Sequence, residues 1–141
     1  MVPSVFTRII AGDFPGRFVW RDERCVAFLS INPLAAGHTL VVPRSEVDHW
    51  LDLEEATNDH IHRVARAIGA AQMLAFKPIR VGLIVAGFEV PHVHVHVIPT
   101  MTMANLDFSN AAANPDPDEL DNAARRLREA LTTLGRSEVS E

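Results

Sequence analysis

The heptapeptide at 92–98, HVHVHVI, limits what this chain can fold into more than any other stretch of it. Side chains along a β-strand point alternately to opposite faces, so His92, His94 and His96 share one face. The valines between them share the other face and suit a hydrophobic core. The pattern therefore predicts a strand that carries three imidazoles on one side and packs into a core with the other.

The rest of the chain predicts an α+β domain built on a five-stranded, largely antiparallel sheet. Hydrophobic periodicity and turn residues indicate a short N-terminal helix, five strands and two longer helices. The spacing of Asp52 and Glu55 matches a capping box and predicts the start of the first long helix. The expected ranges are 4–16 for the short helix, 53–76 and 116–135 for the long helices, and 17–23, 25–31, 38–43, 79–87 and 92–99 for the strands, the last two joined by a short turn around Gly87 and Phe88.

Composition narrows the class of protein. A length of 141 residues fits one domain, and a hydrophobic content of 48% is enough to bury a core. The net charge of -5 and the lack of a long basic run argue against nucleic acid or an anionic membrane surface as partners. No apolar run reaches the ~20 residues of a membrane span, the start does not resemble a signal peptide, and Cys25 is the single cysteine. We expect a soluble, cytoplasmic protein.

The histidines admit two readings that involve no catalysis by imidazole. One is an exposed polar face, although three imidazoles in phase are not typical of a strand surface. The other is a metal site. Neighbouring histidines of the motif lie about 6.6 Å apart and the outer two about 13 Å apart, whereas Zn–N bonds are about 2.0–2.1 Å. One ion cannot easily hold all three, but two of them could bind it with help from His38 or His49.

A third reading gives all three histidines a use. A neutral imidazole that donates its Nδ1–H keeps Nε2 free as a nucleophile or base near neutral pH. Neighbouring rings can then donate to phosphate oxygens and to a departing group. We therefore favour a site that acts on phosphorus.

The motif resembles the signature of the histidine-triad (HIT) family, His-φ-His-φ-His-φ-φ with φ hydrophobic. The segments CVAFLSINPLAAGHTLVVPR and VFTRIIAGDFPGRFVWRDE also resemble the family, in the same order along the chain. The resemblance covers about 4–108 and implies a HIT-like fold there, with 109–141 as a C-terminal loop and helix completing the same domain. It also implies a homodimer in which the sheet continues from one subunit into the other.

The resemblance further implies hydrolysis or transfer at the α-phosphorus of nucleoside phosphoramidates, aminoacyl adenylates or dinucleoside polyphosphates. By motif position, His94 is the nucleophile that forms a nucleotidyl-histidine, and His92 orients it through its backbone carbonyl. His96 contacts the phosphate and the leaving group, and His38 is a fourth histidine near the phosphate. The residues implied to bind a purine nucleotide are Phe6, Ile9, Phe28, Ser30, Ile31, Asn32, Leu40 and Glu89.

Three departures from the family pattern bear on function. Ser30 stands where the family commonly has an aspartate that binds the ribose hydroxyls. The loop before the triad is short, with Ala86 and Phe88 near the places of an asparagine and a phosphate-contacting glutamine. Many bacterial members carry a Cys-x-x-Cys zinc pair near the start, and this sequence has none there, so we expect no structural zinc. We also expect no metal at the site and no cofactor. Two alternatives to the enzyme therefore stay open, a nucleotide-binding module with weak catalysis and, less favoured, a metal-dependent hydrolase.

Overall fold

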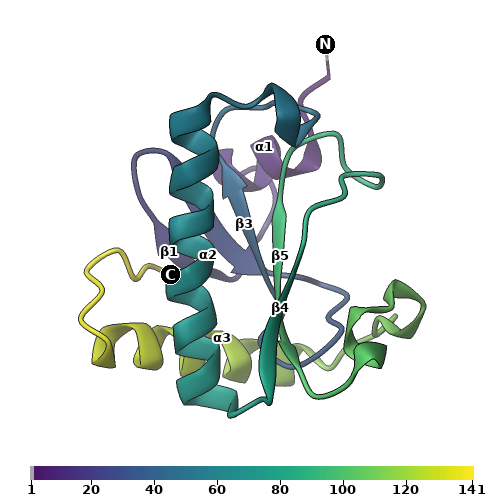
Figure 1. The fold of residues 1–141 in the computed structure, drawn as a ribbon, viewed down its shortest axis with the longest axis vertical. Coiled ribbons are helices and arrows are strands. Elements are labelled where there is room, and N and C mark those ends of the chain that lie inside the picture. The colour runs from purple at the N-terminus through teal and green to yellow at the C-terminus, as the bar shows by residue number, and fades with distance from the viewer. Residues whose placement is uncertain (1) are drawn as a thin grey trace.

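A five-stranded antiparallel sheet in the order β1-β2-β3-β5-β4 forms the middle of the molecule (Figure 1). The structure is a computed structural model that describes residues 2–141. The predicted α+β class with five strands and two main helices is confirmed. The strands are β1 (Phe18–Arg21), β2 (Cys25–Leu29), β3 (Thr39–Pro43), β4 (Arg80–Ile84) and β5 (Val95–Thr100).

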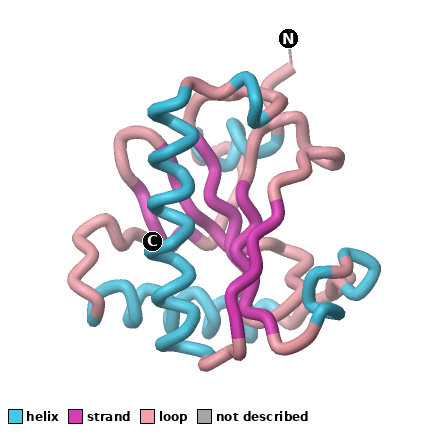
Figure 2. The backbone as a smooth tube through the Cα atoms, in the orientation of Figure 1, coloured by secondary structure: helices cyan, strands magenta, loops and turns pink. Residues whose placement is uncertain are grey.

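Helices cover the two faces of this sheet unequally. The long helices α2 (Glu55–Phe76) and α3 (Pro117–Thr133) pack on one face, and the short α1 (Val5–Ala11) packs on the other (Figures 1 and 2). Alternate residues of β2 enter the two cores, so Ala27 packs with the long helices and Phe28 with α1. Within residues 2–141, no helix combines the length and apolarity needed to cross a bilayer. Because α1 is short, its face of the sheet keeps room for a cavity.

The predicted capping box of α2 is wrong. Asp52 instead ends a 3-10 helix, η1 (Trp50–Asp52), which begins because His49 Nδ1 accepts a hydrogen bond from the Leu51 N–H at 3.1 Å. The chain is extended at the following residue, Leu53, whose side chain is buried in the core, and α2 begins only at Glu55. With Leu53 extended and buried, Asp52 lies in η1 and Glu55 in α2, so the two residues do not form a capping box.

The strand that carries the histidines is shorter than predicted. β5 begins at Val95, so His92 and His94 precede it, and residues 85–94 form a loop rather than a short turn. The reason is a change of backbone partner, since the Val93 N–H donates to the carbonyl of Val47 at 2.8 Å instead of joining the sheet ladder. The alternation of side chains persists through this segment, because Val93 and Val95 both lie in the core.

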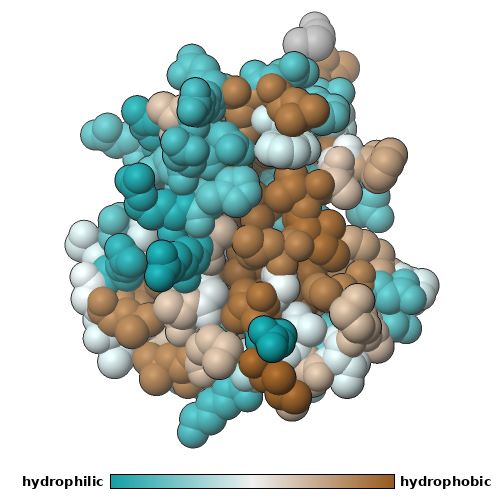
Figure 3. Space-filling model, viewed as in Figure 1, coloured by the Kyte–Doolittle hydropathy of each residue, from teal (hydrophilic) through white to brown (hydrophobic). Residues whose placement is uncertain are grey.

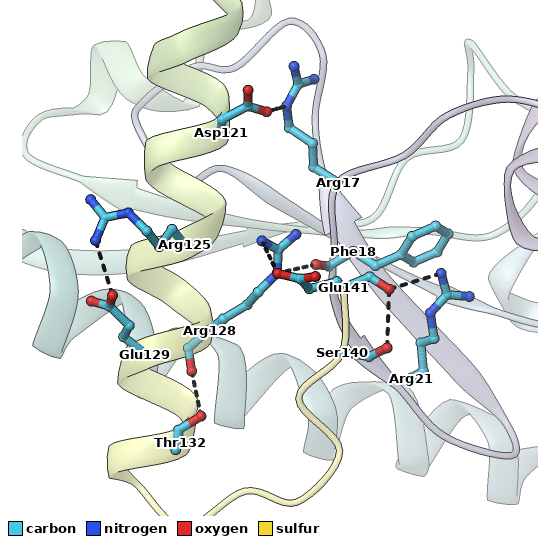
Figure 4. Close-up of polar contacts among 10 residues, drawn as sticks. All are labelled: Arg17, Phe18, Arg21, Asp121, Arg125, Arg128, Glu129, Thr132, Ser140 and Glu141. Carbon is cyan, nitrogen blue, oxygen red and sulfur yellow. Dashed lines mark hydrogen bonds and ion pairs between the residues drawn. The ribbon is translucent and has the colours of Figure 1, made fainter.

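The two edges of the sheet differ. Residues 138–141 run beside β1, where the Arg21 N–H donates to the Glu138 carbonyl at 3.0 Å and the Ser140 N–H donates to the Val19 carbonyl at 3.3 Å. Figure 4 shows Ser140 and Glu141 of this segment near Arg21 of β1. The outer edge of β1 is therefore covered by the chain's own C-terminal segment.

β4, at the opposite edge, has no such cover among residues 2–141. Its flank exposes Ile79 by 66% and Leu83 by 50%. Figure 3 shows hydrophobic side chains gathered over this part of the molecule, beside α2. Past β5 the chain continues through two 3-10 helices, η2 (Met103–Leu106) and η3 (Phe108–Asn110), before it reaches α3.

Candidate active site

A cavity of about 870 Å³ opens beside α1. One wall is apolar, one carries histidines and one is formed by the segment after β5. All eight residues implied to bind the nucleotide line it, as do three of the four histidines, while His92 lies behind the wall. The lining members of the predicted set are Phe6, Ile9, Phe28, Ser30, Ile31, Asn32, Leu40, Glu89, His38, His94 and His96.

His94 presents an unoccupied nitrogen at this cavity. A carbonyl can only accept, so the 2.8 Å contact between His94 Nδ1 and the His92 carbonyl places the proton of the ring on Nδ1. Nε2 then has a free lone pair and no hydrogen-bond partner among residues 2–141. The ring packs edge-on against Phe6 and His96, with centroid distances of 4.9 and 4.8 Å. The orientation needed for a nucleophilic imidazole is thus built into the fold.

The proton positions on His38 and His96 follow from one backbone bond. The Leu34 N–H donates to His38 Nδ1 at 3.0 Å, so neutral His38 carries its proton on Nε2. That Nε2–H donates to His96 Nδ1 at 2.9 Å. Neutral His96 therefore carries its proton on its own Nε2, where it can donate to a substrate oxygen.

Burial keeps these rings neutral. Burial, and then the neighbouring His94 ring, lowers the pKa of His38 from 6.5 to about 4. Burial and the His94 and His38 rings lower the pKa of His96 to about 3. The pKa of His94 is also lowered by burial, although its bond to the His92 carbonyl opposes the shift. At neutral pH the site offers lone pairs and N–H donors instead of fixed positive charge.

A buried amide on the opposite side of the sheet holds the His38–His96 pair in place. Gln72 Nε2, from α2, donates to the carbonyls of Gly37 and Val97 at 2.9 Å each. These carbonyls are adjacent in sequence to the two histidines. The sequence interpretation missed Gln72, although a signal was present, because Gln72 follows Ile68 by four positions on the buried stripe of α2.

The third wall was also missed. The ring of Phe108 lies against His96 with a centroid distance of 4.9 Å, and the segment behind it is tied to the loop after β2. Asn32 Nδ2 donates to the Ala112 carbonyl at 2.9 Å, and the Ala112 N–H donates to the Pro33 carbonyl at 3.0 Å. No local pattern could reveal this wall, because its partners are some 80 residues apart in the sequence.

The region predicted to recognise ribose is already hydrogen-bonded. Ser30 Oγ accepts from the Asn32 N–H at 3.2 Å, and the Asn32 amide nitrogen is engaged by the carbonyls of Ala112 and Ala113. Both residues line the cavity. Their contribution to ribose binding stays a prediction, which rests on the Ser30 hydroxyl and the Asn32 amide oxygen.

The charges of the cavity wall are few. Among residues 2–141, Arg17 is the only lysine or arginine in the lining, and its Nε donates to Asp121 at 2.7 Å (Figure 4). Glu89 adds a carboxylate, which acts on His94 by raising its pKa against the effect of burial. The wall therefore supplies little positive charge for a highly charged anion.

The triad does not gather three metal ligands around one point. His49, the suggested helper, caps η1 and does not line the cavity. Within residues 2–141, the one close group of three ligand atoms is Asp22, Cys25 and His60, behind β2.

Asp22, Cys25 and His60 already hydrogen-bond to one another, with Asp22 as the acceptor. Asp22 accepts from Trp20 Nε1 and His60 Nε2 at 2.8 Å each and from Cys25 Sγ at 3.6 Å. Burial alone would raise the pKa of Asp22, but the bonds from Trp20 and His60, with the backbone N–H groups of Cys25 and Arg24, hold it at about 2. Burial and Asp22 raise the pKa of the Cys25 thiol, which disfavours the thiolate that a metal would need.

The fold and site, an antiparallel sheet with His38, His94 and His96 at one cavity, are those of a histidine-triad domain. The chain belongs to the HIT domain family, whose pattern matches residues 11–103, and so to a superfamily of nucleotide-binding hydrolases. It is 36% identical over 139 residues to a HIT-like protein of Mycobacterium tuberculosis, covering 92% of this chain and 94% of that protein.

Solved structures agree with this assignment. A hypothetical histidine triad nucleotide-binding protein from Sulfolobus tokodaii superposes with a TM-score of 0.81 at 26% identity, covering 93% of each chain. A zinc-bound histidine triad family protein from Mycobacterium smegmatis gives a TM-score of 0.79 at 28% identity, covering 93% of this chain and 94% of that one.

Proposed function

We propose that this chain cleaves nucleotides at the α-phosphorus through a covalent nucleotidyl-histidine on His94. The observation that carries the proposal is the free Nε2 of His94 at the cavity wall, with Nδ1–H bonded to the His92 carbonyl at 2.8 Å. A hydrogen bond at one ring nitrogen selects the tautomer and leaves the other nitrogen nucleophilic. The apolar wall around Phe6 and Phe28 would hold the base.

The chemistry proceeds in two displacements at phosphorus. In the first, His94 Nε2 forms a bond to phosphorus, and the bond to the leaving group breaks with its electron pair. A bound phosphate anion raises the pKa of His96, because a nearby negative charge favours the imidazolium. Protonation of His96 at Nδ1 breaks its bond with His38 Nε2–H, because both nitrogens then carry protons. The imidazolium gives its Nε2 proton to the leaving atom. In the second displacement, water loses a proton to His96, attacks phosphorus and releases His94.

The charge of the cavity wall favours nucleoside phosphoramidates and aminoacyl adenylates over dinucleoside polyphosphates. A polyphosphate carries several negative charges, which proteins ordinarily neutralise with arginine or lysine. Here the one arginine in the lining is paired with Asp121, and Glu89 adds repulsion. A substrate with a single charge at the reacting phosphorus fits this wall better.

Intact-mass measurement after mixing with adenosine 5′-phosphoramidate tests the proposal. We expect an added adenylyl group on the wild-type protein, none on His94→Ala, and turnover that survives exhaustive chelation. The absence of both adduct and turnover would overturn the proposal. Loss of turnover on chelation, with recovery on adding zinc, would favour a metal-dependent hydrolase, a possibility to which the zinc-bound relative lends some weight.

A nucleotide-binding module with weak catalysis is the second candidate. It is favoured by Ser30, whose hydroxyl is already hydrogen-bonded to its own loop. Calorimetry with AMP, read together with the turnover assay, separates the two functions. A binding module would bind AMP without turning over the phosphoramidate.

The homodimer is a further part of the proposal. β1 is covered by residues 138–141, whereas β4 leaves an open edge beside exposed Ile79 and Leu83. Open strand edges with apolar flanks favour pairing with a second copy, and twofold pairing closes the interface.

Light scattering tests this assembly. We expect a dimer for the wild type and a monomer for Leu83→Lys, which places a charge at the β4 edge. Leu134→Lys is the matched control, because Leu134 is similarly exposed, by 45%, at the end of α3. A monomeric wild-type protein would contradict the proposal.

A further inference from the structure

His92 is held at both ring nitrogens, although it does not line the cavity. Its Nε2 lies 2.7 Å from the carbonyl of Pro43, which can only accept, so Nε2 carries the proton. The Nδ1 of the neutral ring is then an acceptor, and Ser4 Oγ lies 2.7 Å from it. The Ser4 hydroxyl therefore donates to His92, and both residues are buried.

Ser4 is itself held by two further bonds, and Thr7 adds a third bond to the same carboxylate, that of Glu46. Its Oγ accepts from the Thr7 N–H at 3.0 Å, which makes it the N-cap of α1. Its backbone N–H donates to Glu46 Oε1 at 2.6 Å, and the Thr7 hydroxyl donates to the same oxygen at 2.6 Å. The Thr7 hydroxyl gives its proton to Glu46 and could accept from Ser4 Oγ, but these two oxygens lie 3.3 Å apart. His92 Nδ1 is closer to Ser4 Oγ, at 2.7 Å, so the Ser4 proton goes to His92.

The bonds of this network end at the proposed nucleophile. The His92 carbonyl accepts the Nδ1–H of His94, and Phe6, two residues after Ser4, contacts both rings with centroid distances of 5.9 and 4.9 Å. We propose that Ser4, held by Glu46, is a positioning residue for the reaction, fixing His92 and hence the carbonyl that orients His94. This inference rests on the function proposed above.

The expected effect is on kcat. Loss of the Ser4 hydroxyl leaves a buried acceptor on His92 without a donor and loosens the backbone that carries the carbonyl. Small displacements of a reacting group are costly, so we expect kcat to fall on the order of tenfold. His92 does not touch the cavity, so KM should stay within about twofold of the wild-type value.

Three substitutions separate positioning from helix capping. Glycine keeps most of the stability of an N-cap, whereas alanine loses it. If Ser4 acts through His92, Ser4→Ala and Ser4→Gly should lose kcat equally, and Ser4→Thr should restore it. If Ser4 acts only as a cap, Ser4→Gly should turn over like the wild type. Asp116→Ala, which removes the cap of α3, is the matched control and should keep kcat.

Nitrogen NMR of the histidine rings gives a readout independent of turnover. In Ser4→Gly the His92 Nδ1 resonance should move, and the His94 Nδ1 proton should exchange with solvent faster than in the wild type. Asp116→Ala should change neither signal. Wild-type kcat in Ser4→Gly, with unmoved resonances, would overturn the inference. An inactive wild-type protein whose His94 proton still depends on Ser4 would overturn the proposed function and keep the positioning contact.

Discussion

Mildly acidic pH should destabilise this protein, because His38 stays neutral in the folded state and becomes protonated in the unfolded state. The pKa of His38 is lowered from 6.5 to about 4 in the folded protein by burial and by the nearby His94 ring. Between these two values the unfolded chain binds more protons than the folded one, so the free energy of unfolding falls as the pH falls. The contribution of His38 to stability is therefore fully present above about pH 6.5 and is lost progressively toward about pH 4.

The magnitude follows from the proton affinities. Each tenfold change in proton affinity corresponds to about 1.4 kcal/mol, and integration from pH 7 to pH 5 gives a loss of about 2 kcal/mol for His38 alone. His38 is only 1% exposed, so solvent screening removes little of this effect. The pKa of His96 is also lowered. The measured fall in the free energy of unfolding should therefore be larger than the contribution of His38 alone.

Urea unfolding at pH 7, 6 and 5 and constant salt provides the assay. His38→Asn keeps an acceptor for the Leu34 N–H but cannot titrate, so its stability should depend less steeply on pH than that of the wild type. Phe108→Leu is the control, because it perturbs the lining of the same cavity and removes no titrating group, and it should keep the wild-type pH dependence. Identical slopes for His38→Asn and wild type would refute the reasoning.

Three other outcomes are expected. His94→Ala should abolish the adduct and nearly all turnover, and His96→Ala should slow turnover by about 10²–10⁴-fold. His92→Ala should cost least, about the same tenfold as loss of the Ser4 hydroxyl, because alanine keeps the carbonyl but not the ring that fixes it; equal losses at His92 and His94 in steady-state rates would be inconsistent with this. Ser30→Asp should tighten AMP binding by about 1–2 kcal/mol through charge-assisted bonds to ribose, and unchanged affinity by calorimetry would show that Ser30 is misplaced. Glu89→Gln should raise kcat/KM for diadenosine triphosphate relative to the phosphoramidate, and an unchanged ratio would argue against charge selection.

The sequence predicted the histidine wall well because strand alternation is a local property. Val93 and Val95 remain in the core even though β5 begins only at Val95. The boundary itself was not predictable, since it depends on which backbone accepts the Val93 N–H, and that carbonyl belongs to Val47.

The residues that hold His92 in place could not be predicted from the sequence, for a different reason. Periodicity assigns a residue to a face but does not say which distant polar group it will meet. Ser4 stands at the start of the helix that the sequence predicts at 4–16, yet its bond to His92 joins residues 88 positions apart. Glu46 is an exposed charge in a loop, a place where carboxylates are common, and nothing nearby in the sequence marks it.

The burial of Cys25 has a practical consequence. Its thiol is wholly inaccessible, it faces the carboxylate of Asp22, and its pKa is raised, so an alkylating reagent finds no thiolate while the domain is intact. Because the chain contains no other cysteine, labelling of this one side chain counts the molecules whose core has opened. The purified protein thus carries a reporter of its own unfolding, which intact mass reads as one added alkyl group on each molecule that has opened.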